Sequence, residues 1–175
     1  MKKIVIVASI LAVAIGLSLS PIAAAAPAWI TPTSNTITQK GNIAVLSVTT
    51  GDVIPKKPDA FVNANVVAGF AWADLDSGEI VVTTIHPNLG RDSHQNPDAW
   101  HAHTATLTSG TTDSDFCVAS INSTPEAGIS TSGNTQTLRI NVSDLSVAVS
   151  DLDGAVGFTI NPDAACGSGL GVQLS

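Results

Sequence analysis

Alternation of apolar and polar residues with a period of two is the sequence feature that most limits the possible folds. After the first 25 residues, no stretch keeps helical periodicity over three turns. Short runs rich in Val, Ile, Thr and Ala recur instead, separated by Gly, Ser, Asn, Asp or Pro. The runs predicted to be strands are 42–50, 61–73, 79–86, 100–108, 116–121, 136–142, 145–149, 155–160 and a short one within 167–174. This spacing predicts an all-β protein, an antiparallel β-sandwich or Greek key.

The first 25 residues have the pattern of a cleaved signal peptide. Lys2 and Lys3 form a basic start, an apolar run covers 4–19, and small residues offer an Ala-x-Ala cleavage site ending at Ala25. A permanent anchor is the alternative, but the run is shorter than the roughly 20 residues that a helical span needs. We therefore expect a secreted, extracytoplasmic protein without a stable membrane span after cleavage.

The expected organisation is one domain after the signal peptide. Residues 1–25 are the signal peptide, 26–60 an N-terminal arm and first strand, and 61–175 the remainder of a single β-sandwich domain. The arm is rich in Pro, Thr and Ser, with Trp29 and Ile30 as its large apolar anchors. About 150 residues are enough to bury a hydrophobic core.

Charge excludes one class of partner. Without Lys2 and Lys3 the chain has 5 Lys and Arg against 14 Asp and Glu, a net charge of −9. Such a field repels a phosphate backbone, so nucleic acid is not an expected partner. Charged residues make up only 12% of the chain, which argues against a disordered acidic tail.

The chain contains two cysteines, Cys117 and Cys166. In an exported protein an even pair most simply forms one disulfide, which would tie the last strand to the middle of the domain. The alternative is that Cys117 binds a metal ion together with histidines.

The segment from Asp74 to Gly78 is predicted to be the turn of a β-hairpin spanning 66–86. Its Asp-x-Asp-x-Gly spacing also suggests a calcium loop. The EF-hand pattern, however, needs an acid or amide at its fifth position and Gly at the sixth, where this chain has Gly78 and Glu79. The turn is the favoured interpretation.

All four histidines lie between residues 86 and 103. Residues i and i+2 of a strand share a face, so His101 and His103 project side by side. If strands 79–86 and 100–108 pair antiparallel, the end of the first brings His86 to that pair. The 13-residue connection 87–99, long for a hairpin, carries His94 and can fold over them.

Three convergent imidazoles predict a zinc or copper site, with His94 or a carboxylate of the connecting loop completing it. His86 on the first strand, and His101 and His103 on the second, share the expected core-facing side of their strands with apolar residues. Because protons compete with metal for imidazole, affinity is expected to fall as the pH drops through about 6.5. The alternative is that these are ordinary polar histidines, hydrogen-bonded to Asp92 or Asp98.

One segment resembles a known family. Gly69-Phe70-Ala71, Leu75-Asp76-Ser77-Gly78, an alternating strand and His101-x-His103 together are similar to a CHRD (chordin-type) domain. The resemblance covers about forty residues, 69–107, and lacks the glycine-rich run that should follow the histidines, where Thr104-Ala105-Thr106 continues the strand. It implies an extracellular β-domain and leaves the molecular role open.

Three functional classes remain. The favoured one is an exported binding module with a histidine-based transition-metal site. The second is a cell-surface or filament subunit that forms homo-oligomers or binds a surface partner by strand exchange through 26–40. The third is a zinc-dependent hydrolase or hydratase. No convincing second catalytic group supports the enzyme, because Glu79 and Glu126 are the only glutamates and no Ser lies in a nucleophile elbow.

Overall fold

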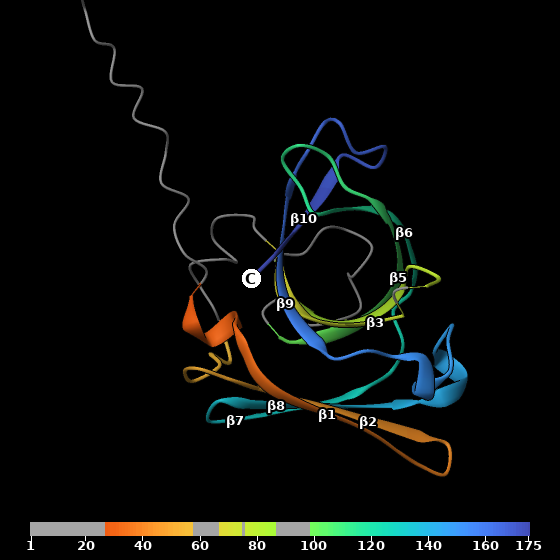
Figure 1. The fold of residues 1–175 in the computed structure, drawn as a ribbon. Helices are drawn as coiled ribbons and strands as arrows, with labels where there is room; N and C mark the ends of the chain where they lie inside the picture. Colours follow the sequence, from red (N-terminus) through yellow and green to blue (C-terminus); the bar gives the residue numbers. More distant parts are fainter. Residues whose placement is uncertain (1–26, 58–66, 75, 87–98) are drawn as a thin grey trace, which may run out of the picture.

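A computed structural model describes residues 27–57, 67–74, 76–86 and 99–175. Within these residues the chain forms two antiparallel β-sheets, one open and one closed (Figure 1). The open sheet has the strand order β1-β2-β8-β7, and the closed barrel has the order β10-β6-β5-β4-β3-β9. The strands are β1 (Pro32–Lys40), β2 (Ile43–Thr50), β3 (Val67–Ala73), β4 (Glu79–Ile85), β5 (His101–Ser109), β6 (Phe116–Ser123), β7 (Gly128–Ser132), β8 (Thr135–Asn141), β9 (Ala155–Pro162) and β10 (Leu170–Leu174).

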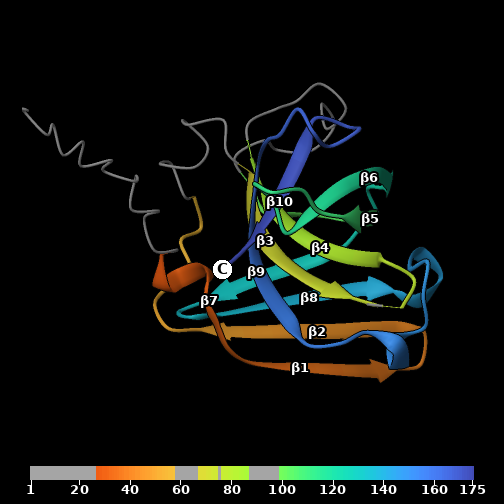
Figure 2. The same cartoon turned by 45° about the horizontal axis from the view of Figure 1, so that its top comes forward.

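The antiparallel all-β prediction is confirmed, whereas the expected sandwich is not. Strands β9 and β10 complete a ring with β3 to β6, so one sheet closes on itself instead of staying open. Figure 2 shows the open sheet lying against one side of this barrel. Closure leaves the barrel without unpaired edges, while β1 and β7 remain the edges of the open sheet.

Two hydrophobic clusters follow from this arrangement. The first joins inward side chains of β2 and β8, including Leu46 and Leu138, to Phe70 and Trp72 on the outer face of the barrel. It docks the open sheet on the barrel. The second lies inside the barrel and contains Ala71, Ile80, Val82, Ala105, Val118, Phe158 and Val172. Each barrel strand next to the open sheet therefore has two buried faces, which explains the nearly continuous burial of β3 and β4.

The N-terminal segment and the segment 145–149 differ from expectation. Residues 32–40, expected as part of an arm, form β1 and pair with β2 from Lys40↔Ile43 to Pro32↔Thr50. The predicted strand at 145–149 is wrong, because residues 145–148 connect the 3-10 helix η2 (Val142–Asp144) to the 3-10 helix η3 (Val149–Asp151), which Val149 begins. Its apolar side chains pack against the first cluster without joining a ladder.

The turns confirm the hairpin prediction for β3 and β4. Asp74 Oδ1 accepts hydrogen bonds from the backbone amides of Asp76 (3.0 Å) and Ser77 (3.4 Å), and its Oδ2 accepts one from the Ser77 hydroxyl (2.6 Å). The Ser77 hydroxyl and the Asp76 amide hold the pKa of the Asp74 carboxyl below its ordinary value. Gly78 has a φ of +74°, a conformation that Gly adopts without strain. The Asp74 carboxylate therefore stabilises the turn.

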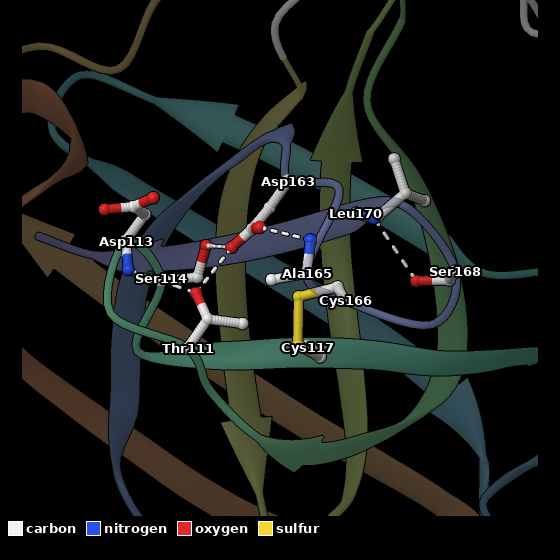
Figure 3. The surroundings of a disulfide bond; sticks show 9 residues. All are labelled: Thr111, Asp113, Ser114, Cys117, Asp163, Ala165, Cys166, Ser168 and Leu170. Carbon is white, nitrogen blue, oxygen red and sulfur yellow. Dashed lines mark hydrogen bonds between the residues drawn. A yellow bond between two sulfur atoms is a disulfide. The ribbon is translucent and has the colours of Figure 1, made fainter.

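The predicted disulfide is present. Cys117 on β6 and Cys166 are bonded, with their Cα atoms 5.4 Å apart (Figure 3). Beside the bridge, Asp163 Oδ2 accepts hydrogen bonds from the hydroxyls of Thr111 (2.6 Å) and Ser114 (2.7 Å). The disulfide and this carboxylate together connect the loop before β6 to the loop between β9 and β10.

None of the helices in the described part of the chain has the length and hydropathy that a bilayer span requires. The proposed signal peptide lies outside the described residues.

Candidate metal centre

Two neighbouring barrel strands bring three histidines to one end of the barrel. In the antiparallel pair of β4 and β5, Thr84 lies opposite His101 and Val82 lies opposite His103. His86 follows the last residue of β4, so it extends past His101 along the same face. All three are buried, with 4–5% of their surface exposed. The predicted convergence of the three is confirmed.

Trp100, just before β5, fixes which face of that strand turns inward. Its indole Nε1 donates a hydrogen bond to the Pro55 carbonyl (3.1 Å), and its ring stacks on Phe70 at 5.8 Å between centroids. Both partners lie on the side of the open sheet. Because side chains alternate along a strand, anchoring Trp100 outward directs His101 and His103 into the barrel.

The imidazoles are close enough to share one ion. The Nε2 atoms of His86 and His101 are 2.8 Å apart. One nitrogen from each of the three rings can be chosen so that all lie within 4.8 Å of one another. The rings of His86 and His103 are stacked at 6.0 Å, and His101 stands edge-on to both.

Hydrogen bonds orient two of the rings for binding through Nε2. His101 Nδ1 lies 3.0 Å from the Ala99 carbonyl, which can only accept, so Nδ1 carries the proton. In the neutral ring this leaves a lone pair on Nε2. His103 Nδ1 lies 3.0 Å from the Thr124 hydroxyl, a second contact of the kind that holds metal-binding histidines in place.

The geometry fits a tetrahedral ion after a small adjustment. Zinc–nitrogen bonds of about 2.0–2.1 Å place two tetrahedral ligand atoms about 3.3 Å apart. The His86–His101 separation of 2.8 Å would open slightly, and the widest separation, at most 4.8 Å, would shorten. Ring rotations of this size need no change in the strand register. Imidazole nitrogen suits both zinc and copper.

Other residues proposed from the sequence divide into two groups. Cys117 is bonded to Cys166, so the alternative in which it binds a metal is excluded. His94 and the loop carboxylates of 87–98 lie outside the described residues, so their part in the site stays a prediction.

Sequence reasoning missed three groups that orient the histidines. These are the Ala99 carbonyl, the Thr124 hydroxyl and the Thr84 hydroxyl, which lies 3.3 Å from His101 Nε2. Thr84 could have been found, because it shares the inward face of its strand with His86. Thr124 could not have been found, because two register shifts between β5 and β6 prevent its position from being derived by counting residues along the strands.

Comparison of the chain with protein-family models, with curated proteins and with solved structures finds no match. The resemblance to a CHRD domain over 69–107 therefore remains a prediction from a few short motifs.

Proposed function

We propose that this protein is an exported binding module that holds a zinc or copper ion on His86, His101 and His103. The observation that carries the proposal is the convergence of three buried imidazoles, with one nitrogen of each within 4.8 Å of the others. Imidazole is the commonest metal ligand in proteins, and the spacing of these three nitrogens suits their binding to one ion.

Two features that favour export also support the proposal. The Cys117–Cys166 disulfide is consistent with an oxidising, extracytoplasmic compartment. The signal-peptide pattern of 1–25 predicts cleavage that leaves Ala26 as the new N-terminus. Mass spectrometry of the protein from its native compartment tests this step, and an intact Met1 would refute it.

The metal is tested by elemental analysis and calorimetry. Protein purified from its native compartment should contain zinc or copper at near one ion per chain. The variant H101A/H103A should bind the metal at least about 100-fold more weakly, since it loses two of three ligands. The variant T108A, at an exposed position on the same strand, is the matched control. Equal affinity of H101A/H103A and the parent would refute the site.

Three further variants examine how the site is built. T124V removes the hydroxyl that contacts His103 Nδ1, and we expect about tenfold weaker metal binding, the lower end for such contacts because Thr124 is exposed. T124S keeps the hydroxyl and should bind as the parent does. H94A measures whether the connecting loop supplies a fourth ligand.

The strand-exchange alternative is less well supported. It requires residues 26–40 to leave their own sheet, whereas β1 is paired with β2 along its length. The hydrolase alternative needs a base near the metal. Glu79 accepts hydrogen bonds from Thr106, Asn122 and Ser146 and is thereby committed to structural contacts near the other end of β4.

A further inference from the structure

The side chains of the residues that the structure describes do not fill the barrel interior. Small barrels usually pack their interior completely or enclose a single ligand. Here several inward positions carry alanine, among them Ala71, Ala73 and Ala105, and a cavity of about 1460 Å³ lies against all six barrel strands. Pockets for small ligands typically measure about 300–1,000 Å³. The cavity is therefore large enough for a sizeable molecule.

Large apolar side chains that line the cavity are partly exposed along the β6–β10 side of the barrel. Three of the cavity's lining residues, Ile121, Leu170 and Leu174, are large apolar side chains with 46%, 37% and 44% of their surface exposed. They lie on β6 and β10, which pair through only two residue pairs, Gly171↔Cys117 and Val172↔Phe116. This is the shortest seam of the barrel. Exposed apolar side chains of this kind are typical of a binding site for an apolar ligand.

The two ends of the cavity differ in charge. His86 and His103 line one end, whereas Asp74, Asp76 and Asp153 line the end near the β3–β4 turn. Between them the inward side chains are mainly apolar, including Val82, Leu107, Phe116, Val118, Val156, Phe158, Ile160 and Val172. Carboxylates at one end repel an anionic group, and imidazole N–H groups or a bound metal ion attract one at the other.

We propose that the barrel binds a long-chain carboxylic acid, with its apolar chain between the strands and its carboxylate at the histidines. The six-residue distance from Ile80 to His86 along β4 corresponds to about 20 Å, which suits an extended alkyl chain. Oxygen of a carboxylate is a normal fourth ligand for zinc held by three histidines. The carboxylate end of this proposal rests on the proposed metal centre, whereas the apolar end does not.

Calorimetry with dodecanoic acid and dodecanol tests the proposal on the full mature chain, both zinc-loaded and after removal of metal by a chelator. The zinc-loaded parent should bind dodecanoic acid at least tenfold more tightly than dodecanol. H101A/H103A should bind the two with similar affinity, because only the alkyl chain is still recognised. No binding of dodecanoic acid by the parent would overturn the proposal.

Variants of the barrel separate the two proposals. A71L/A105L fills the interior and should weaken dodecanoic acid binding at least tenfold while zinc binding stays unchanged, which also shows that the barrel is folded. A148L adds the same side chain at an exposed position that does not line the cavity and should have no effect. If the parent does not bind zinc but still binds dodecanoic acid, the proposed metal centre is wrong and the apolar binding site is supported.

I121S/L170S provides a second variant that does not depend on repacking the interior. Both positions are exposed, so the fold should tolerate the change. A less apolar cavity lining at these two positions should weaken dodecanoic acid binding several-fold and leave zinc affinity as it is. If A71L/A105L, shown to be folded, and I121S/L170S both bind dodecanoic acid as tightly as the parent, the ligand does not enter the barrel and the proposal is wrong.

Discussion

A buried hydrogen bond between Thr83 and Gln136 connects the barrel to the open sheet, and the variant T83V should measure its contribution to stability. The Thr83 hydroxyl on β4 donates to Gln136 Oε1 on β8 at 2.5 Å, and both residues have 0% of their surface exposed. Val has nearly the shape of Thr, so the variant removes the donor without opening a cavity. Gln136 Oε1 then loses this donor in a place that water does not reach.

The expected loss is about 2 kcal/mol of unfolding free energy, within the range of about 1–3 kcal/mol for a buried polar group deprived of its partner. For a domain of this size, that corresponds to a fall in Tm of about 4–8 °C. Thermal and urea unfolding followed by circular dichroism measure both quantities. T137V is the matched control, since the Thr137–Ser47 hydroxyl pair is only half-buried and its loss should change stability by less than about 1 kcal/mol.

The double variant T83V/Q136M completes the cycle. Replacing both partners with apolar groups removes the unsatisfied carbonyl, so the double variant should recover most of the stability that T83V loses. If T83V is as stable as the parent, or if T83V/Q136M is as unstable as the sum of its single changes, the two groups are not coupled across the sheets and the reasoning fails.

Three further changes act on other parts of the fold. Reducing Cys117–Cys166 should lower the unfolding free energy by about 2–5 kcal/mol, and free thiols in the unreduced, unfolded protein would contradict the bridge. Hydrogen bonds from two hydroxyls and a backbone amide hold the pKa of Asp163 below its ordinary value, so its contribution to stability is complete at neutral pH. That contribution is lost as the pH falls from about 3.9 through the lowered pKa, and D163N should remove this part of the acid sensitivity in urea unfolding at several pH values. G157A places a Cβ against the Ile30 carbonyl oxygen, a backbone atom that cannot move aside, and should destabilise by about 1–3 kcal/mol or more in the same assay; parent-like stability would contradict the close approach.

Several features could be derived from the sequence because they depend on local chemistry. Period-two alternation predicted most strands to within a few residues, and the turn residues of 74–78 predicted the β3–β4 hairpin. Two further hairpins carry a local signal of the same kind in their turns. Gly41-Asn42 and Gly133-Asn134 are two-residue turns with φ near +60° at Gly, and they connect β1 to β2 and β7 to β8. Turn chemistry is local, so β1 and β7, the two partners that alternation did not predict, could have been predicted from these turns.

The candidate site could also be derived from the sequence, because the alternation of side chains along each strand shows which residues share a face. His101 and His103 share a face because the side-chain period of a strand is two, and His86 joins them because adjacent antiparallel strands place the end of one beside the start of the next. This inference required only two neighbouring strands. It did not require knowledge of the rest of the fold.

Closure of the barrel and the cavity inside it were decided by the tertiary structure. Whether a sheet closes depends on pairing between strands far apart in the chain, here β3 with β9 and β6 with β10. Alternation within each strand is the same in a sandwich and in a barrel, so the sequence pattern could not separate them. The same alternation made 145–149 resemble a strand, although its side chains only cover the core. Local periodicity shows which face of a strand is buried, and only the long-range pairing determines what that face is buried against.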